Sequence, residues 1–428
     1  MSAVSLQPDT LERAVAVLSG DGPAESRQLA LQRFLKRGFP TPRDEDWKYT
    51  DLANVIDISE RWLAHAPGVQ PETLDETQVA AIRSSIDASW LVFANGRLNE
   101  ALSDALSESA IEVTRIDNTN VALNIEDPLA DLNAALMVDG ISIRIGNNTR
   151  LEKPICLLFV DRATSTPMVT QSRVQISLEA GSSAQFVEYH ASSGDGDHYS
   201  NVVVDVTIAA DAALDYVRMQ NRSRDHCQTQ RLNVRLETSS VMRHFGLDLG
   251  GALARSDLKI DIVGAGASAE FNGLYIGGDQ QYIDNHTRVD HRVGPAISVQ
   301  EYRGILSGRS RCVWNGKAIV HKGADGSDAE QANHNLLLSA HSEINAKPEL
   351  EIYADEVKCA HGTTVGQLDD AALFYLRTRG LDPQHARRVL TRAFATSVVE
   401  KSPIPELRDL ISSQVEQRLG DLASGDQM

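Results

Sequence analysis

The chain has 428 residues, of which 42% are apolar and 5% aromatic, and it carries a net charge of −18. This charge excludes nucleic acid or an anionic membrane surface as the main partner, because both need clustered cations and the chain has no such basic run. The N-terminus lacks a signal-peptide pattern, and no stretch of about 18 consecutive apolar residues could span a membrane. The four cysteines are widely spaced, without a CxxC pair, which is typical of reduced thiols, so we expect a cytoplasmic location.

The first 88 residues are predicted to be mainly helical. Apolar residues recur at helical spacing over residues 26–38, and Gly38 with Pro40 ends this helix. The expected apolar stripe consists of Leu29, Leu31, Phe34 and Leu35. The polar segment PTPRDEDWKYTDL, residues 40–52, contains two aromatic residues, which usually anchor such a loop on a neighbouring surface, although a binding role is the alternative. A further helix is predicted within residues 71–88.

Residues 89–366 show the pattern of short β-strands, organised by an internal repeat. Each repeat is a strand, a turn of small residues and a second strand, and a unit this short must stack on its neighbours to bury its inward face. A period of this length favours a parallel β-helix, with a β-sandwich as the second choice and a propeller as a further alternative. The five repeats begin at Arg173, Val203, Arg231, Asp257 and Thr287, at intervals of 30, 28, 26 and 30 residues.

Two segments resemble nucleotide-binding motifs but lack features that those motifs require. The series Gly264-x-Gly266-x-x-Ala269 lies inside the repeat and precedes a strand pattern, whereas a dinucleotide fingerprint must open a helix. The phosphate-loop pattern ending at Lys317 has arginine in place of its first glycine and alanine in place of the Ser/Thr that holds magnesium. The sequence therefore gives almost no indication of an enzymatic activity.

The amides of Gln331, Asn333 and Asn335 alternate along a predicted strand. They are interpreted either as a ladder on one face of the solenoid or as surface residues facing water.

The segment PELEIYADEVKCAHGTTVG, residues 348–366, contains the most suggestive side chains. Cys359 and His361 continue the parity of Glu349 and Glu351, so an unbroken strand would project both from one face, close enough to share an ion. Two ligands do not complete a site, because tetrahedral zinc or an iron–sulfur cluster needs about four. The pattern alone favours a buried cysteine and a satisfied core histidine, and a metal site would need ligands from elsewhere in the chain or from a partner.

Beyond Gly366 the pattern becomes helical. Asp369 is predicted to cap one helix that ends at Gly380, and Asp382 followed by Pro383 begins the next. The chain is thus divided into an N-terminal helical region (1–88), a β core (89–366) and a C-terminal helical region (367–428).

The segment EIYADEVKCAHGTTVGQLD, followed by ALFYLRTRG and ARRVLTRAFATSVVE, resembles the SufB/SufD family of iron–sulfur cluster assembly proteins. EQANHNLLLSAHSEINAKPELEI also resembles this family, and PTPRDEDWKYTDL is similar to the N-terminal signature of its SufD branch. These segments cover most of the second half of the chain and part of the N-terminal region.

The resemblance implies a right-handed parallel β-helix core with α-helical N- and C-terminal regions. It further implies a non-enzymatic scaffold subunit of the SUF system, in which the SufC ATPase supplies ATP hydrolysis. The chain would pair with SufB through the end of the β-helix and dock SufC near residues 367–390. A homodimer of the isolated chain is left open.

The resemblance also implies a role for Cys359 and His361 as candidate ligands of a nascent cluster shared with SufB, which would supply the missing ligands. We therefore expect no tightly bound cofactor in the isolated chain, and transient iron or an iron–sulfur cluster in the complex. Two alternatives from other classes are a β-helix enzyme acting on polysaccharide and a purely structural partner in which the Cys-His pair belongs to the core.

Overall fold

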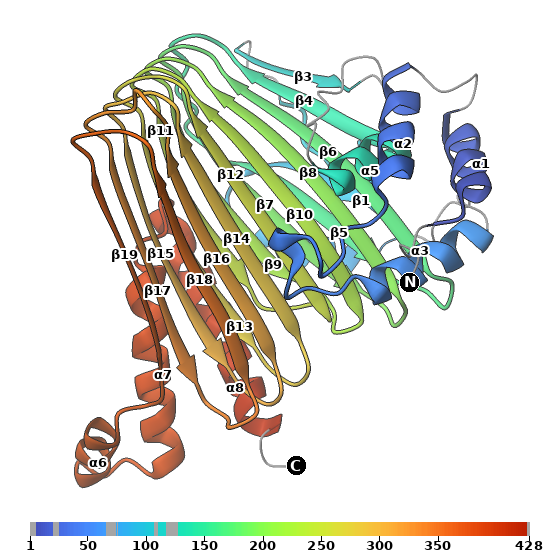
Figure 1. The fold of residues 1–428 in the computed structure, drawn as a ribbon. Coiled ribbons are helices and arrows are strands. Elements are labelled where there is room, and N and C mark those ends of the chain that lie inside the picture. Colours follow the sequence, from blue (N-terminus) through green and yellow to red (C-terminus); the bar gives the residue numbers. More distant parts are fainter. Residues whose placement is uncertain are drawn as a thin grey trace.

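Two parallel sheets run side by side along the molecule and form a β-solenoid (Figure 1). The fold is that of a computed structural model, which describes residues 6–19, 25–65, 74, 76–106, 110–116 and 127–425. Each coil contributes one strand to a ten-stranded sheet A and one to a nine-stranded sheet B. This architecture confirms the predicted parallel β-helix core with helices at both ends, and it excludes the sandwich and the propeller.

From β4 onward the strands alternate between the two sheets along the chain. Sheet A consists of β1 (Ser89–Ala94), β2 (Arg97–Leu98), β5 (Ile155–Arg162), β7 (Ser183–Ser193), β9 (Ala213–Asn221), β11 (Val241–Asp248), β13 (Ser268–Gly277), β15 (Ile297–Leu306), β17 (Asp328–Leu337) and β19 (Lys358–Gly366). Sheet B consists of β3 (Ile111–Arg115), β4 (Asp139–Ile145), β6 (Met168–Leu178), β8 (His198–Ile208), β10 (His226–Leu236), β12 (Leu253–Ile262), β14 (Tyr282–His291), β16 (Arg311–Val320) and β18 (Glu343–Ile352). Two pairs of these strands are antiparallel, β1 with β2 and β3 with β4. Both pairs lie at the starting end of the solenoid.

The predicted repeat matches the register of four successive coils. Arg173 pairs with Val203, Val203 with Arg231, and Arg231 with Asp257. The fifth predicted start was wrong by one residue, because the partner of Asp257 is His286 and not Thr287. A shift of one residue exchanges inward and outward side chains. The sequence pattern does not reveal such a shift, because the corners between strands vary in length and consist of small residues.

The interior of the solenoid is apolar on one side and polar on the other. Val204, Leu232 and Leu258 stack in register within the main apolar core. Nearer the start of the same strands the inward side chains are polar. An example is Gln230, which donates hydrogen bonds to buried Glu188. Because a buried polar group must be hydrogen-bonded, this half of the interior fixes side-chain positions more strictly than an apolar filling would.

Helices cover the outer faces of the two sheets (Figure 1). The N-terminal group packs on sheet B, and the last two helices pack with α4 on sheet A. The helices are α1 (Pro8–Ser19), α2 (Glu25–Arg37), η1 (Glu45–Trp47), α3 (Ala53–His65), α4 (Glu76–Ser84), α5 (Pro128–Leu136), α6 (Asp370–Thr378), α7 (Pro383–Val399), η2 (Pro405–Leu407) and α8 (Arg408–Gly425). Among the helices of the described ranges, none is long and apolar enough to cross a membrane.

The structure corrects two details of the helical prediction. In α2 the buried apolar residues are Ala30, Leu31 and Phe34, whereas Leu29 is 48% exposed, because it lies off the face that meets α5. The helix α5 was not predicted, since it interrupts a region of β pattern. It is capped by Asp127, and Arg27 of α2 donates to two carbonyl groups near its C-terminus.

Candidate functional site

The last coil of the solenoid, formed by β18 and β19, leaves one edge of each sheet without a neighbouring strand in the described part of the chain. The Lys358 N–H donates to the Ser327 carbonyl, toward the preceding coil. Because successive N–H groups along a strand point to opposite edges, those of residues 359, 361, 363 and 365 face outward from the end of the solenoid. This free edge can accept another strand.

The row of outward-facing backbone N–H groups is interrupted on β18, whereas it is continuous on β19. The Glu343 N–H points back to the Ser310 carbonyl, so the even-numbered positions of β18 face the free edge. Pro348 occupies one of these positions and has no N–H to offer. A strand added at this end would therefore find its full set of backbone donors on β19.

Cys359 and His361 lie two residues apart on β19 and share its inward face. Their register partners on β17 are Ala329 and Gln331, which are both buried inside the solenoid. Cys359 is half-buried against the apolar core, whereas His361 is exposed at the mouth of the solenoid. A thiol and an imidazole thus stand together at the open end.

The predicted parity between these residues and the preceding strand was wrong. The segment after Ile352 turns, with Glu356 in the left-handed region, and β19 begins only at Lys358 in the other sheet. Leu350 packs against the interior, so Glu349, its neighbour along the strand, points outward while Cys359 points inward. The strand runs through Gly362 and ends at Gly366.

The protonation of Cys359 depends on what it binds. Burial raises the pKa of its thiol, and the carboxylate of Asp328 adds to that rise. The thiol is therefore protonated at neutral pH, and a metal ion that binds it must displace this proton.

The amide row Gln331, Asn333 and Asn335 faces the interior, so its interpretation as surface residues was wrong. Asn333 donates to Tyr275 Oη at 3.1 Å, and Asn335 donates to Asn333 Oδ1 at 2.6 Å. One bond joins β17 to β13, two coils away, and the other joins two residues of β17. The amides therefore form a buried network and not the ladder of identical stacked amides that was the other interpretation.

The helix α6 follows the terminal coil and stands apart from both sheets (Figure 1). Asp369 caps it as predicted, accepting from the Ala371 N–H at 3.0 Å. None of its residues is buried, and Phe374 and Tyr375 are 67% and 60% exposed. An amphipathic helix normally buries such side chains, so α6 presents an apolar face with no cover in the described structure.

The long helix that follows is anchored at its far end. Asp382 caps α7 as predicted, accepting from the N–H groups of Gln384 and His385, both at 3.0 Å. Ala395 and Val398, near the C-terminus of α7, are buried against the outer face of sheet A. The start of α7 therefore projects together with α6.

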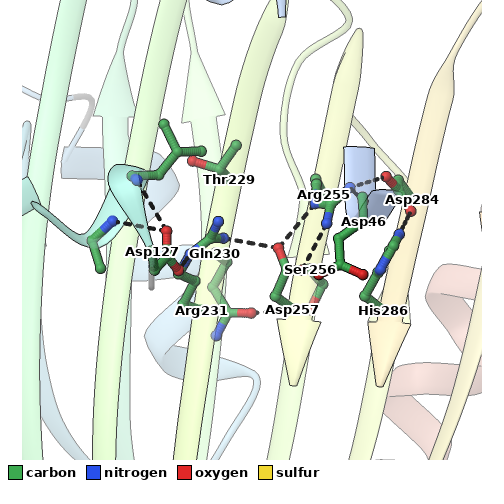
Figure 2. A network of polar contacts seen from close by, with 12 residues as sticks. Asp46, Asp127, Thr229, Gln230, Arg231, Arg255, Ser256, Asp257, Asp284 and His286 are labelled. Carbon is green, nitrogen blue, oxygen red and sulfur yellow. Dashed lines mark hydrogen bonds and ion pairs between the residues drawn. The ribbon is translucent and has the colours of Figure 1, made fainter. Parts of the chain in front are cut away.

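The segment 40–52 crosses the outer face of sheet B, as its aromatic residues led us to expect. The ring of Trp47 is buried, with the guanidinium carbon of Arg255 3.7 Å from its centroid. Figure 2 shows this guanidinium among carboxylates, and Arg255 pairs with Asp257 at 2.9 Å and Asp284 at 2.7 Å. Burial raises the pKa of Asp257, but Arg255 and Arg231 outweigh that effect and hold it below its usual range.

A groove of about 610 Å³ opens beside this segment, lined by side chains of both charges. Several of its cations pair with carboxylates, as with Lys317 and Glu351 at 2.5 Å or Arg288 and Asp290 at 2.6 Å. The groove is therefore a charge-balanced seam that attaches the N-terminal segment to the solenoid.

The sequence did not indicate a second group of side chains with metal-ligand chemistry. Asp161, His198 and His226 are buried inside the solenoid, with ligand atoms within 4.8 Å of one another. Arg222 donates to the Asp161 carboxylate at 2.5 Å, so a cation already occupies the acidic ligand. Burial lowers the pKa of His198 to about 4, and the group is a neutral-histidine network around a buried ion pair. Its only signal in the sequence is that His198 and His226 fall at equivalent positions of consecutive repeats.

The fold and the site define a parallel β-helix protein with a thiol–imidazole pair at an open end. Residues 159–394, more than half of the chain, match the family model described as "SUF system FeS cluster assembly, SufBD core domain". The chain therefore belongs to the SufBD family of iron–sulfur cluster assembly proteins.

Individual relatives agree with this assignment. The chain is 30% identical to the iron–sulfur cluster assembly protein SufD of Escherichia coli, over 98% of this chain and 99% of that protein. It is 29% identical to a SufBD family protein of Synechocystis, over 89% and 88% of the two chains. SufD of Bacillus subtilis is 25% identical over 69% of this chain and 67% of its own.

Proposed function

We propose that the chain is a SufD-like scaffold subunit that pairs with SufB through the open end of its solenoid and docks the SufC ATPase through α6 and the start of α7. The observation that carries this proposal is the position of Cys359 and His361 on the inward face of the last strand, beside an edge without a neighbouring strand. Membership of the SufBD family assigns the chain to iron–sulfur cluster assembly.

Pairing at the open end follows from the chemistry of strand edges. An edge with unpaired N–H and C=O groups either is blocked or receives a strand from a partner, and β19 carries no proline that would block it. A paralogous solenoid with its own open end offers such a strand. The same geometry permits a homodimer when the chain is isolated.

A site shared across this junction explains why the chain offers only two ligands. The thiol of Cys359 and the imidazole of His361 suit iron or an iron–sulfur cluster, which takes about four protein ligands. SufB would contribute the remaining ligands from its facing edge. The cluster is the cargo of the complex, so its residence at the site is transient.

Docking of the ATPase on α6 is supported by the exposed aromatic side chains of this helix and by its position away from both sheets. Phe374 and Tyr375 lie on a helix that contacts α7 and is not buried against either sheet. A partner that covers them would bury apolar surface without disturbing the solenoid. ATP hydrolysis is assigned to that partner and not to this chain.

The proposal is tested by expressing the chain with the SufB and SufC proteins of its source organism and measuring the mass of the intact complex after size-exclusion chromatography. We expect a complex of all three proteins. Replacing Phe374→Glu together with Tyr375→Glu should remove SufC and leave SufB bound, because the open end is untouched. A chain that elutes alone in the wild-type experiment would contradict the proposal.

The same complex then tests the ligands by anaerobic cluster reconstitution. We expect Cys359→Ser and His361→Ala to lower the amount of cluster bound several-fold while the complex keeps its mass. If both variants load as much cluster as the wild type, the pair is not a ligand site, and the scaffold role alone remains.

A further inference from the structure

Gln331 has a side-chain oxygen whose isolation needs an explanation. The residue is 4% exposed, and its Oε1 has no hydrogen-bond partner among the described residues. Its Nε2 donates to the Glu349 carbonyl at 3.3 Å, which holds the amide inside the last two coils. A buried carbonyl oxygen without a donor costs about 1–3 kcal/mol, so such a group usually marks a missing partner.

The regular stacking of the solenoid shows what faces this oxygen from sheet B. One coil earlier, Thr287 donates across the interior to Gln300 Oε1 at 2.6 Å. The register places Gly316 after Thr287 and Gln331 after Gln300. A Cβ atom added to Gly316 would lie 2.9 Å from Gln331 Oε1, so the two positions do face each other.

The residue opposite Gln331 is thus a glycine, which brings no side-chain donor. The indole of Trp314 lies against the same glycine, 2.4 Å from the added Cβ, and restricts where the amide can move. Sheet B therefore leaves the Gln331 oxygen without the hydroxyl that its counterpart Gln300 receives.

One coil further, the same two columns reach the mouth of the solenoid. Pro348 follows Gly316, and His361 follows Gln331. Neighbouring strands lie about 4.8 Å apart, so the side chains of His361 and Gln331 project from adjacent strands on the same inward face, within reach of each other. Pro348 has no polar side chain to compete for the ring, and a ring N–H of His361 is the donor that suits the isolated oxygen.

We propose that Gln331 is a positioning residue for His361. A rotation of the His361 side chain brings one ring nitrogen to donate to Gln331 Oε1, which fixes the tautomer and turns the other nitrogen out of the mouth as a metal ligand. This inference rests on the proposed ligand role of His361. Metal-binding histidines are held by such a partner on the second nitrogen, and losing it typically lowers metal affinity about 10- to 100-fold.

The test combines a tautomer measurement on the full-length chain with metal binding by its anaerobic complex with SufB. Ring nitrogen chemical shifts of His361, assigned with His361→Ala, should show a single tautomer in spectra recorded at about pH 8. A mixture of tautomers in the wild type would overturn the inference without any variant. Co²⁺ serves as the metal probe.

Three variants separate positioning from a structural role. Gln331→Met keeps the volume but removes the acceptor, so we expect mixed tautomers and an affinity for Co²⁺ lowered about 10- to 100-fold. Gln331→Glu keeps an acceptor oxygen and should restore the single tautomer and most of the affinity. Gln300→Met is the matched control one coil deeper, and it should leave the tautomer of His361 unchanged.

The outcomes distinguish this inference from the proposed function. If His361→Ala leaves Co²⁺ binding unchanged, the ligand role fails, whatever the tautomer. If His361→Ala weakens binding but Gln331→Met changes neither the tautomer nor the affinity, the positioning role of Gln331 is overturned and the ligand role stands.

Discussion

Asp131 of α5 is a buried carboxylic acid whose surroundings favour its neutral form. It is 0% exposed, and neither of its carboxyl oxygens has a hydrogen-bond partner in the described structure. Burial raises its pKa to about 6, although the charge of Arg33, whose Nε lies 3.3 Å away, opposes that rise. The contact between α2 and α5 therefore contains a carboxyl group that resists ionisation.

This carboxyl group makes stability depend on pH in a predictable direction. Its pKa in the folded state lies above the unfolded value of about 4, so the folded state holds the proton more tightly. Its contribution is complete below about pH 4 and is lost as pH rises to about 6, by about 3 kcal/mol at most. We expect Asp131→Asn to flatten this part of the profile in urea unfolding at a series of pH values. Parallel profiles for the two proteins over that range would refute the assignment.

Glycines inside the central strands make room for aromatic rings of the adjacent coil. Gly273 of β13 pairs with Tyr302 of β15, and a Cβ at Gly273 would lie 2.3 Å from the tyrosine ring. Two residues on, the order is reversed, since Gly304 pairs with Tyr275 and a Cβ there would also lie 2.3 Å from the ring. These strands can stack only because each ring meets a residue without a side chain.

Gly273→Ala should therefore destabilise the fold by about 2 kcal/mol, which is typical of overpacking in a dense core. Gly362→Ala on the terminal strand is the matched control, because nothing lies within 4 Å of the added Cβ. That change should stay within about 0.5 kcal/mol. Thermal unfolding of the two variants beside the wild type decides the matter, and equal losses would contradict the packing argument.

The two ends of the molecule differ in how their strand edges are treated. At the start, the antiparallel strands β2 and β3 close sheets A and B. At the other end β18 and β19 have no such cover in the described chain, and α6 extends beyond them (Figure 1). Each sheet thus ends in an antiparallel strand at the start of the solenoid and in a parallel strand at the other end, where the proposed site lies.

Val365 offers a way to block the free edge without breaking the solenoid. Its N–H faces outward, since the bonds from β19 to β17 use the even-numbered positions. Val365→Pro should weaken pairing with SufB at least several-fold, while Val365→Thr, which keeps the N–H, should pair like the wild type. Affinity measured with purified SufB tests this, with circular dichroism to confirm the fold. Equal affinity of the two variants would exclude edge pairing through this position.

Local and periodic chemistry alone determined much of this protein. The starts at Arg173, Val203, Arg231 and Asp257 predict four coils in register, because each repeat must match its neighbour to bury the same face. The caps Asp369 and Asp382 were predictable because a cap bonds only to the next few residues.

Tertiary structure decided the features that depend on distant pairing. The turn after β18 and the partner strand β17 determine which side of β19 faces inward. Cys359 and His361 therefore point into the solenoid, whereas Glu349 points outward. The column of Gln331 beneath His361 also follows from stacking of residues 30 positions apart. Sequence parity is a property of one strand, whereas the direction of a face and its neighbours exist only once strands have paired, because hydrogen bonds between coils set them.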